Sequence, residues 1–204
     1  MNKFIIALLS FLFTSSALRA DVLTGTHLYV EPSVVYASLG KDFKESSGGA
    51  LAIGVSFARH HAIEVEMINF KTESKENIST DLFGHEAKLA LTPVLGTYKY
   101  AFLIGKNLRL LVGISVGVTI EKYDYTAGVG YYGYPYYNSY TFVTTSAYSR
   151  TYYPFTIGGD FGVAYTFTKH VSATAGVKVL GMNETYVTTR GIFTTVQLGL
   201  RYTF

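Results

Sequence analysis

The sequence predicts an all-β fold, an eight-stranded antiparallel up-and-down transmembrane β-barrel, and three observations predict it. Apolar residues alternate with small or polar residues in eight separate segments, which is the two-residue period of a strand with two different surroundings. The connections between these segments are alternately short and long, as in an up-and-down barrel. After residue 20, no apolar run reaches the length of about 20 residues that a membrane helix needs.

The first element is a leader, residues 1–20, which we expect to be absent from the mature protein. It combines the basic Lys3 with an apolar run over residues 4–13 and small residues up to the predicted cleavage point. This is the layout of a secretory signal peptide. Cleavage is expected after Ala17 or Ala20.

The mature part, residues 21–204, is predicted to form a single domain. Loss of Lys3 and Arg19 with the leader lowers the formal net charge of +3 by two, so the chain lacks the basic stripe of a nucleic-acid-binding protein. No nucleic-acid partner is expected. The sequence has no Cys, so no disulfide framework is available.

The first four segments each show an apolar face of alternate residues. These faces are Leu28, Val30, Val34 and Tyr36, with Pro32 in phase; Leu51, Ile53, Val55 and Phe57; Ile63, Val65 and Met67; and Leu89, Leu91, Pro93 and Leu95. The phase of the third segment becomes unclear near Phe70, where we expect a β-bulge.

The last four segments alternate more regularly. Their apolar faces are Leu110, Val112, Ile114, Val116, Val118 and Ile120; Tyr153, Phe155, Ile157, Phe161, Val163 and Tyr165; Val171, Ala173, Ala175, Val177 and Val179; and Val196, Leu198, Leu200, Tyr202 and Phe204.

The connections fall into two classes. The short ones are residues 59–61, 102–107 and 166–170, and the long ones are residues 40–49, 71–86, 121–151 and 181–191. In an up-and-down array of eight strands, the two classes lie at opposite ends and both termini lie at the end of the short turns.

The composition of the second face decides which side points outward. That face is largely Gly, Ser, Thr and Ala, as at Gly113, Ser115 and Gly117. Small residues fit the crowded interior of an eight-stranded barrel, whereas a water-facing surface would favour Lys and Glu. The pattern therefore favours a membrane barrel with a lipid-facing apolar surface over a soluble lipocalin-like barrel, which has apolar residues inside.

The final segment predicts how the barrel closes. A strand in lipid must have every backbone group paired, so the last strand is expected to pair with the first. Its apolar alternation ends with Leu198, Leu200, Tyr202 and Phe204, and this ending resembles the C-terminal assembly signal of outer-membrane proteins.

The mature chain resembles the small eight-stranded outer-membrane β-barrels of the opacity-protein and OmpA/OmpX type. All eight strands match in pattern, while the leader, the final strand and "GISVGV" at 113–118 match in residue type. The resemblance implies outer-membrane localisation with periplasmic termini. It implies outer-membrane lipid, lipopolysaccharide and the β-barrel assembly machinery as partners. We expect no peptidoglycan-binding domain after the barrel.

Four acids and four bases share the parity of the inward face. This predicted lumen network consists of Glu31, Glu64, Glu66, Lys88, Arg109, Asp160, Lys178 and Arg201. Unpaired charges in a narrow interior are destabilising, so ion pairs are expected. Two interpretations follow, a gate in a narrow solute or ion channel and a polar core that fills the barrel. We favour the polar core because eight strands leave only enough space for their own side chains.

Enzyme motifs are sparse. His170 and Ser172 are similar to the His-x-Ser of barrel-type lipid A deacylases. However, those enzymes act at the outer leaflet, whereas these residues are predicted at the periplasmic end. No orienting carboxylate, cofactor motif or metal-ligand cluster accompanies them. We therefore expect no enzyme activity, with a lipid-modifying enzyme as the third alternative.

The long connection at residues 121–151 is rich in Tyr, Gly, Ser, Asn and Thr. Such mixtures recur in binding surfaces, because Tyr offers a large contact area at low entropic cost. The predicted recognition residues are Tyr131, Tyr132, Tyr134, Tyr136, Tyr137 and Tyr140. Alternatively, this stretch extends strands five and six beyond the membrane, with Tyr123, Tyr152 and Tyr153 in the outer aromatic girdle.

These observations predict a non-enzymatic surface protein. It would contribute to envelope structure and, through the Tyr-rich connection, contact a host or cell-surface protein or glycan.

Overall fold

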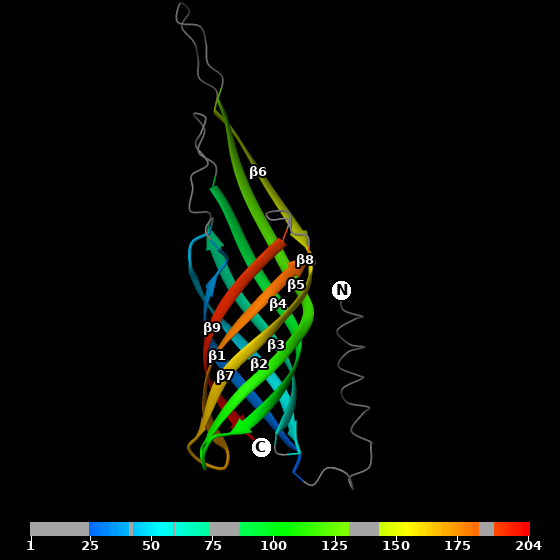
Figure 1. The fold of residues 1–204 in the computed structure, drawn as a ribbon. Helices are drawn as coiled ribbons and strands as arrows, with labels where there is room; N and C mark the ends of the chain where they lie inside the picture. The colour runs from blue at the N-terminus through cyan, green and yellow to red at the C-terminus, as the bar shows by residue number, and fades with distance from the viewer. Residues whose placement is uncertain (1–24, 41–42, 59, 74–85, 131–142, 184–189) are drawn as a thin grey trace, which may run out of the picture.

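The computed structural model describes nine β-strands, which form one antiparallel sheet (Figure 1). The strands are β1 (His27–Ser38), β2 (Ser46–Phe57), β3 (His61–Glu73), β4 (Glu86–Leu103), β5 (Leu108–Gly130), β6 (Val143–Tyr152), β7 (Phe155–Thr166), β8 (Val171–Asn183) and β9 (Arg190–Thr203). The described residues are 25–40, 43–58, 60–73, 86–130, 143–183 and 190–204. Within these ranges, no helix has the length and apolar character to cross a membrane.

Eight of the strands close into a barrel, which confirms the predicted fold class. Neighbouring strands pair in the order β4-β3-β2-β1-β9-β8-β7-β5, and β4 pairs with β5 to complete the circle. The first and last barrel strands meet directly, as Tyr29 lies opposite Thr203. The backbone N–H of Phe204 also donates to the carbonyl of Leu28 at 2.9 Å, so the last residue takes part in closure.

The ninth strand, β6, continues β7 beyond the barrel. Val118 of β5 lies opposite Phe155 of β7, and Glu121 lies opposite Tyr152 of β6 without any change of register. The interruption falls at Tyr153–Pro154, where Pro has no N–H to donate to the ladder. β5 and β6 therefore form a hairpin that rises past the other strands (Figure 1).

Apolar side chains cover the outside of the barrel, as the alternation predicts. Val34, Ile114 and Leu198 are 63–68% exposed, whereas the inward residues Val35, Ser115 and Thr195 of the same three strands are buried. The predicted outward faces are confirmed for seven of the eight segments. Such a continuous apolar surface around a closed barrel is typical of a barrel that faces lipid.

The fourth segment has the opposite phase from the one predicted. Leu89, Leu91 and Leu95 are 0–3% exposed and point inward, while Tyr98 on the same strand is exposed. The predicted bulge near Phe70 is also wrong, because the register between β2 and β3 runs unbroken from Gly48↔Phe70 to Phe57↔His61. Both errors have one cause, an interior that is apolar at this level.

The barrel interior has two levels of different chemistry. An apolar core occupies the end near the long connections and contains Val35, Ala37, Phe43, Ile68, Phe70, Leu89, Leu91, Leu95, Leu180, Met182 and Phe193. Phe70 and Phe193 pack with ring centroids 5.8 Å apart. Charged and hydroxyl side chains fill the other level, closer to the short turns.

Aromatic pairs mark the end of the barrel that carries the short turns, which we call the short-turn end. Three pairs of outward rings lie two residues apart on their strands: Tyr100–Phe102, Tyr165–Phe167 and Tyr202–Phe204, with centroids 4.7–5.2 Å apart. Their position matches an interfacial aromatic girdle. The predicted outer girdle is only partly present, because Tyr153 is 57% exposed while Tyr123 packs against the apolar core.

Candidate functional site

The polar level of the interior contains three cations from different strands. Lys99 Nζ of β4 lies 2.6 Å from Glu64 Oε1 of β3 and 3.6 Å from Asp160 Oδ2 of β7. Tyr29 donates its hydroxyl proton to Glu64 Oε2 at 2.7 Å. Glu64 is 1% exposed, so it requires these charge-assisted partners to remain stable in the interior.

Arg201 of β9 is the second cation. Its Nε and one terminal nitrogen both lie 2.7 Å from Glu31 Oε2 of β1. Thr174 donates to the other oxygen of Glu31 at 2.8 Å. The guanidinium also stacks on Tyr29, 4.1 Å from the ring centroid, a favourable cation–π position. This cluster links β8 and β9 to β1 across the closing seam.

Lys178 of β8 pairs with Glu66 of β3 on the opposite side of the barrel. Their side chains are 2% and 3% exposed. Two glycines create the space for the neighbouring groups. A Cβ at Gly54 would lie 2.5 Å from the Tyr29 ring, and one at Gly113 would lie 2.1 Å from Asp160 Oδ1. The small residues of the inward face are therefore complementary to the large polar side chains.

The structure brings together six of the eight predicted lumen residues and corrects two. Lys88 is exposed on the outer wall, because the phase of its strand is inverted. Arg109 has the predicted inward parity but lies exposed at the short-turn end. Lys99 was not predicted to point inward, because the predicted phase of its strand, β4, was inverted. The polar pair Thr97 and Lys99, in phase with Leu95, was the signal that could have revealed it.

The two levels together close the lumen. Next to the ion pairs, the structure shows a cavity of only about 30 Å³, lined among others by Glu31, Lys99 and Asp160. A cavity of this size has space for only two or three water molecules, at about 10–15 Å³ each. A solute moving along the axis would have to displace both the ion pairs and the apolar core.

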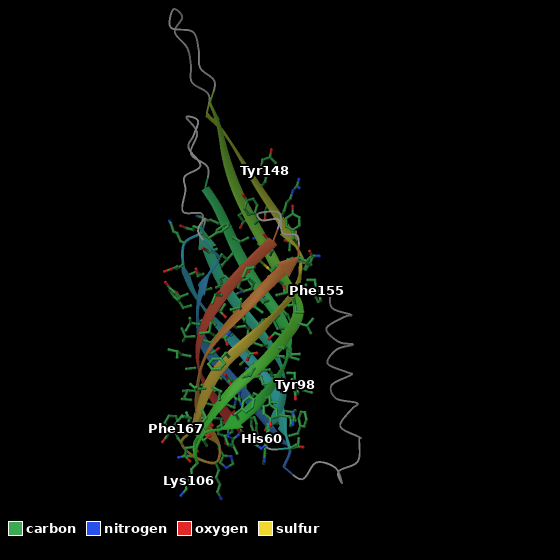
Figure 2. The ribbon with its side chains drawn as sticks, in the orientation of Figure 1. His60, Tyr98, Lys106, Tyr148, Phe155 and Phe167 are labelled. Carbon is green, nitrogen blue, oxygen red and sulfur yellow. The ribbon has the colours of Figure 1, made fainter. Side chains whose placement is uncertain are left out.

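The β5–β6 hairpin replaces most of the predicted long connection with strand. Its pairs extend from Glu121↔Tyr152 to Gly130↔Val143, so the interpretation as strand extension is correct for these residues. Tyr148 is 59% exposed on the hairpin, away from the barrel (Figure 2). Tyr131, Tyr132, Tyr134, Tyr136, Tyr137 and Tyr140 lie outside the described residues.

The predicted His170–Ser172 arrangement is not assembled as a nucleophile and base. The Nδ1 of His170 hydrogen-bonds the carbonyl of Thr203 at 2.8 Å, and Ser172 donates to Thr166 at 3.2 Å. Neither of these hydrogen bonds joins the two residues. Across the described ranges, no three His, Asp or Glu side chains gather in a way that could hold a metal ion.

Comparison with solved structures identifies proteins that share this fold. No protein-family model matches the chain, and a search of curated proteins finds no match either. Solved structures do match. Neisserial surface protein A has a TM-score of 0.52 at 12% identity, over 89% of this chain and 98% of that one. Ail, the attachment invasion locus protein of Yersinia pestis, has a TM-score of 0.51 at 10% identity, over 88% and 97%. The chain therefore has the fold of the small eight-stranded outer-membrane β-barrels.

Proposed function

We propose that the protein is a non-enzymatic surface protein of the bacterial outer membrane, which binds a host or cell-surface protein or glycan through the end of its β5–β6 hairpin. The short-turn end, where β1 begins and β9 ends, would face the periplasm, and the hairpin would face outward. Outer-membrane lipid and lipopolysaccharide would surround the barrel. The observation that carries this proposal is the hairpin, whose 10 residues of β6 pair with β5 beyond the last pair of β5 and β7.

The composition of the hairpin supports a recognition role. Exposed Tyr side chains such as Tyr148 provide large amphipathic contacts, and Gly and Ser allow a binding surface to adapt. Ail, by its name an attachment protein, is one of the structures of similar fold. The apolar core and the ion pairs that fill the lumen among the described residues argue against the narrow-channel alternative, because a solute would have to displace both. The lipid-modifying alternative loses support, since His170 and Ser172 have separate partners.

The test is a truncation that retains the barrel. Residues 125–148 are replaced by Asn-Gly, which suits a two-residue hairpin turn and joins the paired strands directly beyond Asp124↔Ser149. The truncated protein should fold, as judged by a heat-modifiable band, and should lose binding of intact bacteria to host cells and matrix. Unchanged binding would contradict the proposal.

A matched variant separates the tyrosines from hairpin length. The full-length chain with Tyr131, Tyr132, Tyr134, Tyr136, Tyr137 and Tyr140 replaced by Ser retains the length and polarity of the segment. It should bind as poorly as the truncation. Full binding by this variant would assign recognition to other residues of the hairpin.

A further inference from the structure

The short-turn end holds a second cavity, which the proposed surface recognition does not use. Its volume is about 350 Å³, and we call it the short-turn cavity. The basic side chains that line it are His27, His60, His61, Lys99, Arg109, Lys169, His170 and Arg201. All of its lining residues belong to the described part of the chain, and none of them is Asp or Glu. The cavity therefore combines a concave shape with charge of one sign.

The floor of the short-turn cavity is closed. Lys99 and Arg201 lie there with side chains 10% and 12% exposed. Their carboxylate partners Glu31 and Glu64 are buried behind them and do not line the cavity. A ligand entering from the short-turn end would meet cations first and would not pass further along the axis.

Two histidines at the mouth are oriented by the backbone. The Nδ1 of His60 lies 2.9 Å from the carbonyl oxygen of Ala101, and the Nδ1 of His170 lies 2.8 Å from that of Thr203. A carbonyl only accepts, so Nδ1 is the donor in each case. The Nε2 of each ring therefore remains for a ligand. The hydrogen bond to the backbone carbonyl, and not another flexible side chain, sets the orientation of the ring.

Arg109 and Lys169 complete the mouth. Arg109 is the second residue of β5 and Lys169 lies in the turn between β7 and β8, and both are exposed. Neither forms an ion pair with another residue of the described ranges. Figure 2 shows His60 and the turn residue Lys106 at this same end of the barrel. Unpaired cations around a pocket raise the local concentration of anions.

We propose that the short-turn cavity binds a phosphate group, carried by a small soluble molecule or by a lipid headgroup. A phosphate has several acceptor oxygens and more than one negative charge. It can therefore accept from the fork of Arg109 and the ammonium of Lys169, and a hydrogen phosphate can donate its P–O–H to the unprotonated Nε2 of His60 or His170. The volume of about 350 Å³ also leaves space for a compact organic part.

The first experiment titrates inorganic pyrophosphate into the purified full-length barrel in maltoside detergent, which contains no phosphate. Isothermal titration calorimetry should show saturable binding. Arg109→Gln combined with Lys169→Gln should weaken it at least about tenfold, since a hydrogen bond to a charged group contributes about 1.5–3 kcal/mol. Lys71→Gln combined with Lys122→Gln, exposed at the opposite end, is the control and should bind like the parent.

Two outcomes would overturn the proposal: no saturable heat, or equal binding by the parent and the Arg109/Lys169 variant. Each variant is first checked for a heat-modifiable band, so that loss of binding is not loss of fold. A second titration with phosphatidylglycerol added to the micelles identifies the source of the phosphate. Competition with pyrophosphate assigns the site to a headgroup, and its absence assigns the site to a soluble phosphate compound.

Discussion

At the scale of the residue, the ion pairs of the interior connect strands that are far apart in the sequence. Arg201 and Glu31 are separated by 170 positions, and Lys178 and Glu66 by 112. In a buried setting, the desolvation of each charge is offset only while its partner is present. Such a pair therefore contributes little as a unit, but the loss of one member is strongly destabilising.

The pair of Lys178 and Glu66 allows a direct test. Lys178→Met should lower the free energy of unfolding by about 3–5 kcal/mol, because it leaves Glu66 buried without its cation. Adding Glu66→Leu should restore most of the loss. Urea unfolding in detergent micelles provides the measurement. It is followed by circular dichroism, because the chain has no Trp for fluorescence.

The exposed pair of Lys44 and Glu73 serves as the control for that experiment. Its side chains are 58% and 54% exposed and 3.2 Å apart, so Lys44→Met should change stability by less than about 1 kcal/mol. Equal effects at Lys178 and Lys44 would show that the interior pair is hydrated in the folded protein.

Glycine provides a second residue-scale prediction. Gly113→Ala places a Cβ 2.1 Å from Asp160 Oδ1 and 2.9 Å from the carbonyl of Tyr98, so backbone or carboxylate must move. We expect a loss of about 1–3 kcal/mol in unfolding free energy. Gly159→Ala, where the nearest atom is 3.5 Å away, should be nearly neutral. A neutral Gly113→Ala would mean that Asp160 shifts without breaking its contact with Lys99.

Residue parity predicts most of the interior network but misses its central cation. Alternation alone assigned six of its members, since each lies on a strand with one apolar face. These are Glu31, Glu64, Glu66, Asp160, Lys178 and Arg201. Lys99 lies on β4, which has leucines on its inward face. Alternation identifies two faces and not which is inside, so a strand with an apolar inward face is assigned backwards.

At the scale of the element, the register of each strand is set by its neighbours more than by its own pattern. β3 illustrates this point, because its alternation becomes unclear near Phe70 while its register with β2 and β4 stays the same along the whole strand. Sequence indicates where a strand lies, but not how far it extends, since β5 and β6 continue into the predicted connection at residues 121–151. The apolar core at one end of the lumen is a tertiary property that no single segment shows.

The last strand, β9, carries a prediction about assembly. We propose that the β-barrel assembly machinery reads Leu198, Leu200, Tyr202 and Phe204, which all point outward with 46–63% exposure. Phe204→Ala should reduce the amount assembled in the outer membrane of cells several-fold, while refolding of the purified protein in detergent stays unchanged. The control is Phe167→Ala, which removes an equally exposed ring, 59%, from the turn between β7 and β8. An equal reduction by both variants would show that the effect is a general loss of interfacial aromatics.

At the scale of the whole molecule, the lumen is closed twice, by the apolar core and by the ion pairs below it. The refolded protein should therefore give no stable large single-channel conductance in planar bilayers. Phe70→Ala combined with Phe193→Ala enlarges the space in the apolar core but should leave the protein non-conducting, because the ion pairs remain. Large, stable openings of the parent protein would show that the closed interior is not its functional state.

The unbroken register through Tyr153–Pro154 has a practical consequence for engineering. The 10 residues of β6, at about 3.3 Å per residue, carry the described end of the hairpin up to about 30 Å past the end of β7. Its last four pairs, from Ala127↔Ser146 to Gly130↔Val143, also lie past the end of β4. A foreign peptide spliced between Gly130 and Val143 would be presented on a stiff stalk with its termini already held together. If the hairpin faces outward as proposed, the molecule offers an epitope-display scaffold in which the guest sequence stands clear of the barrel strands.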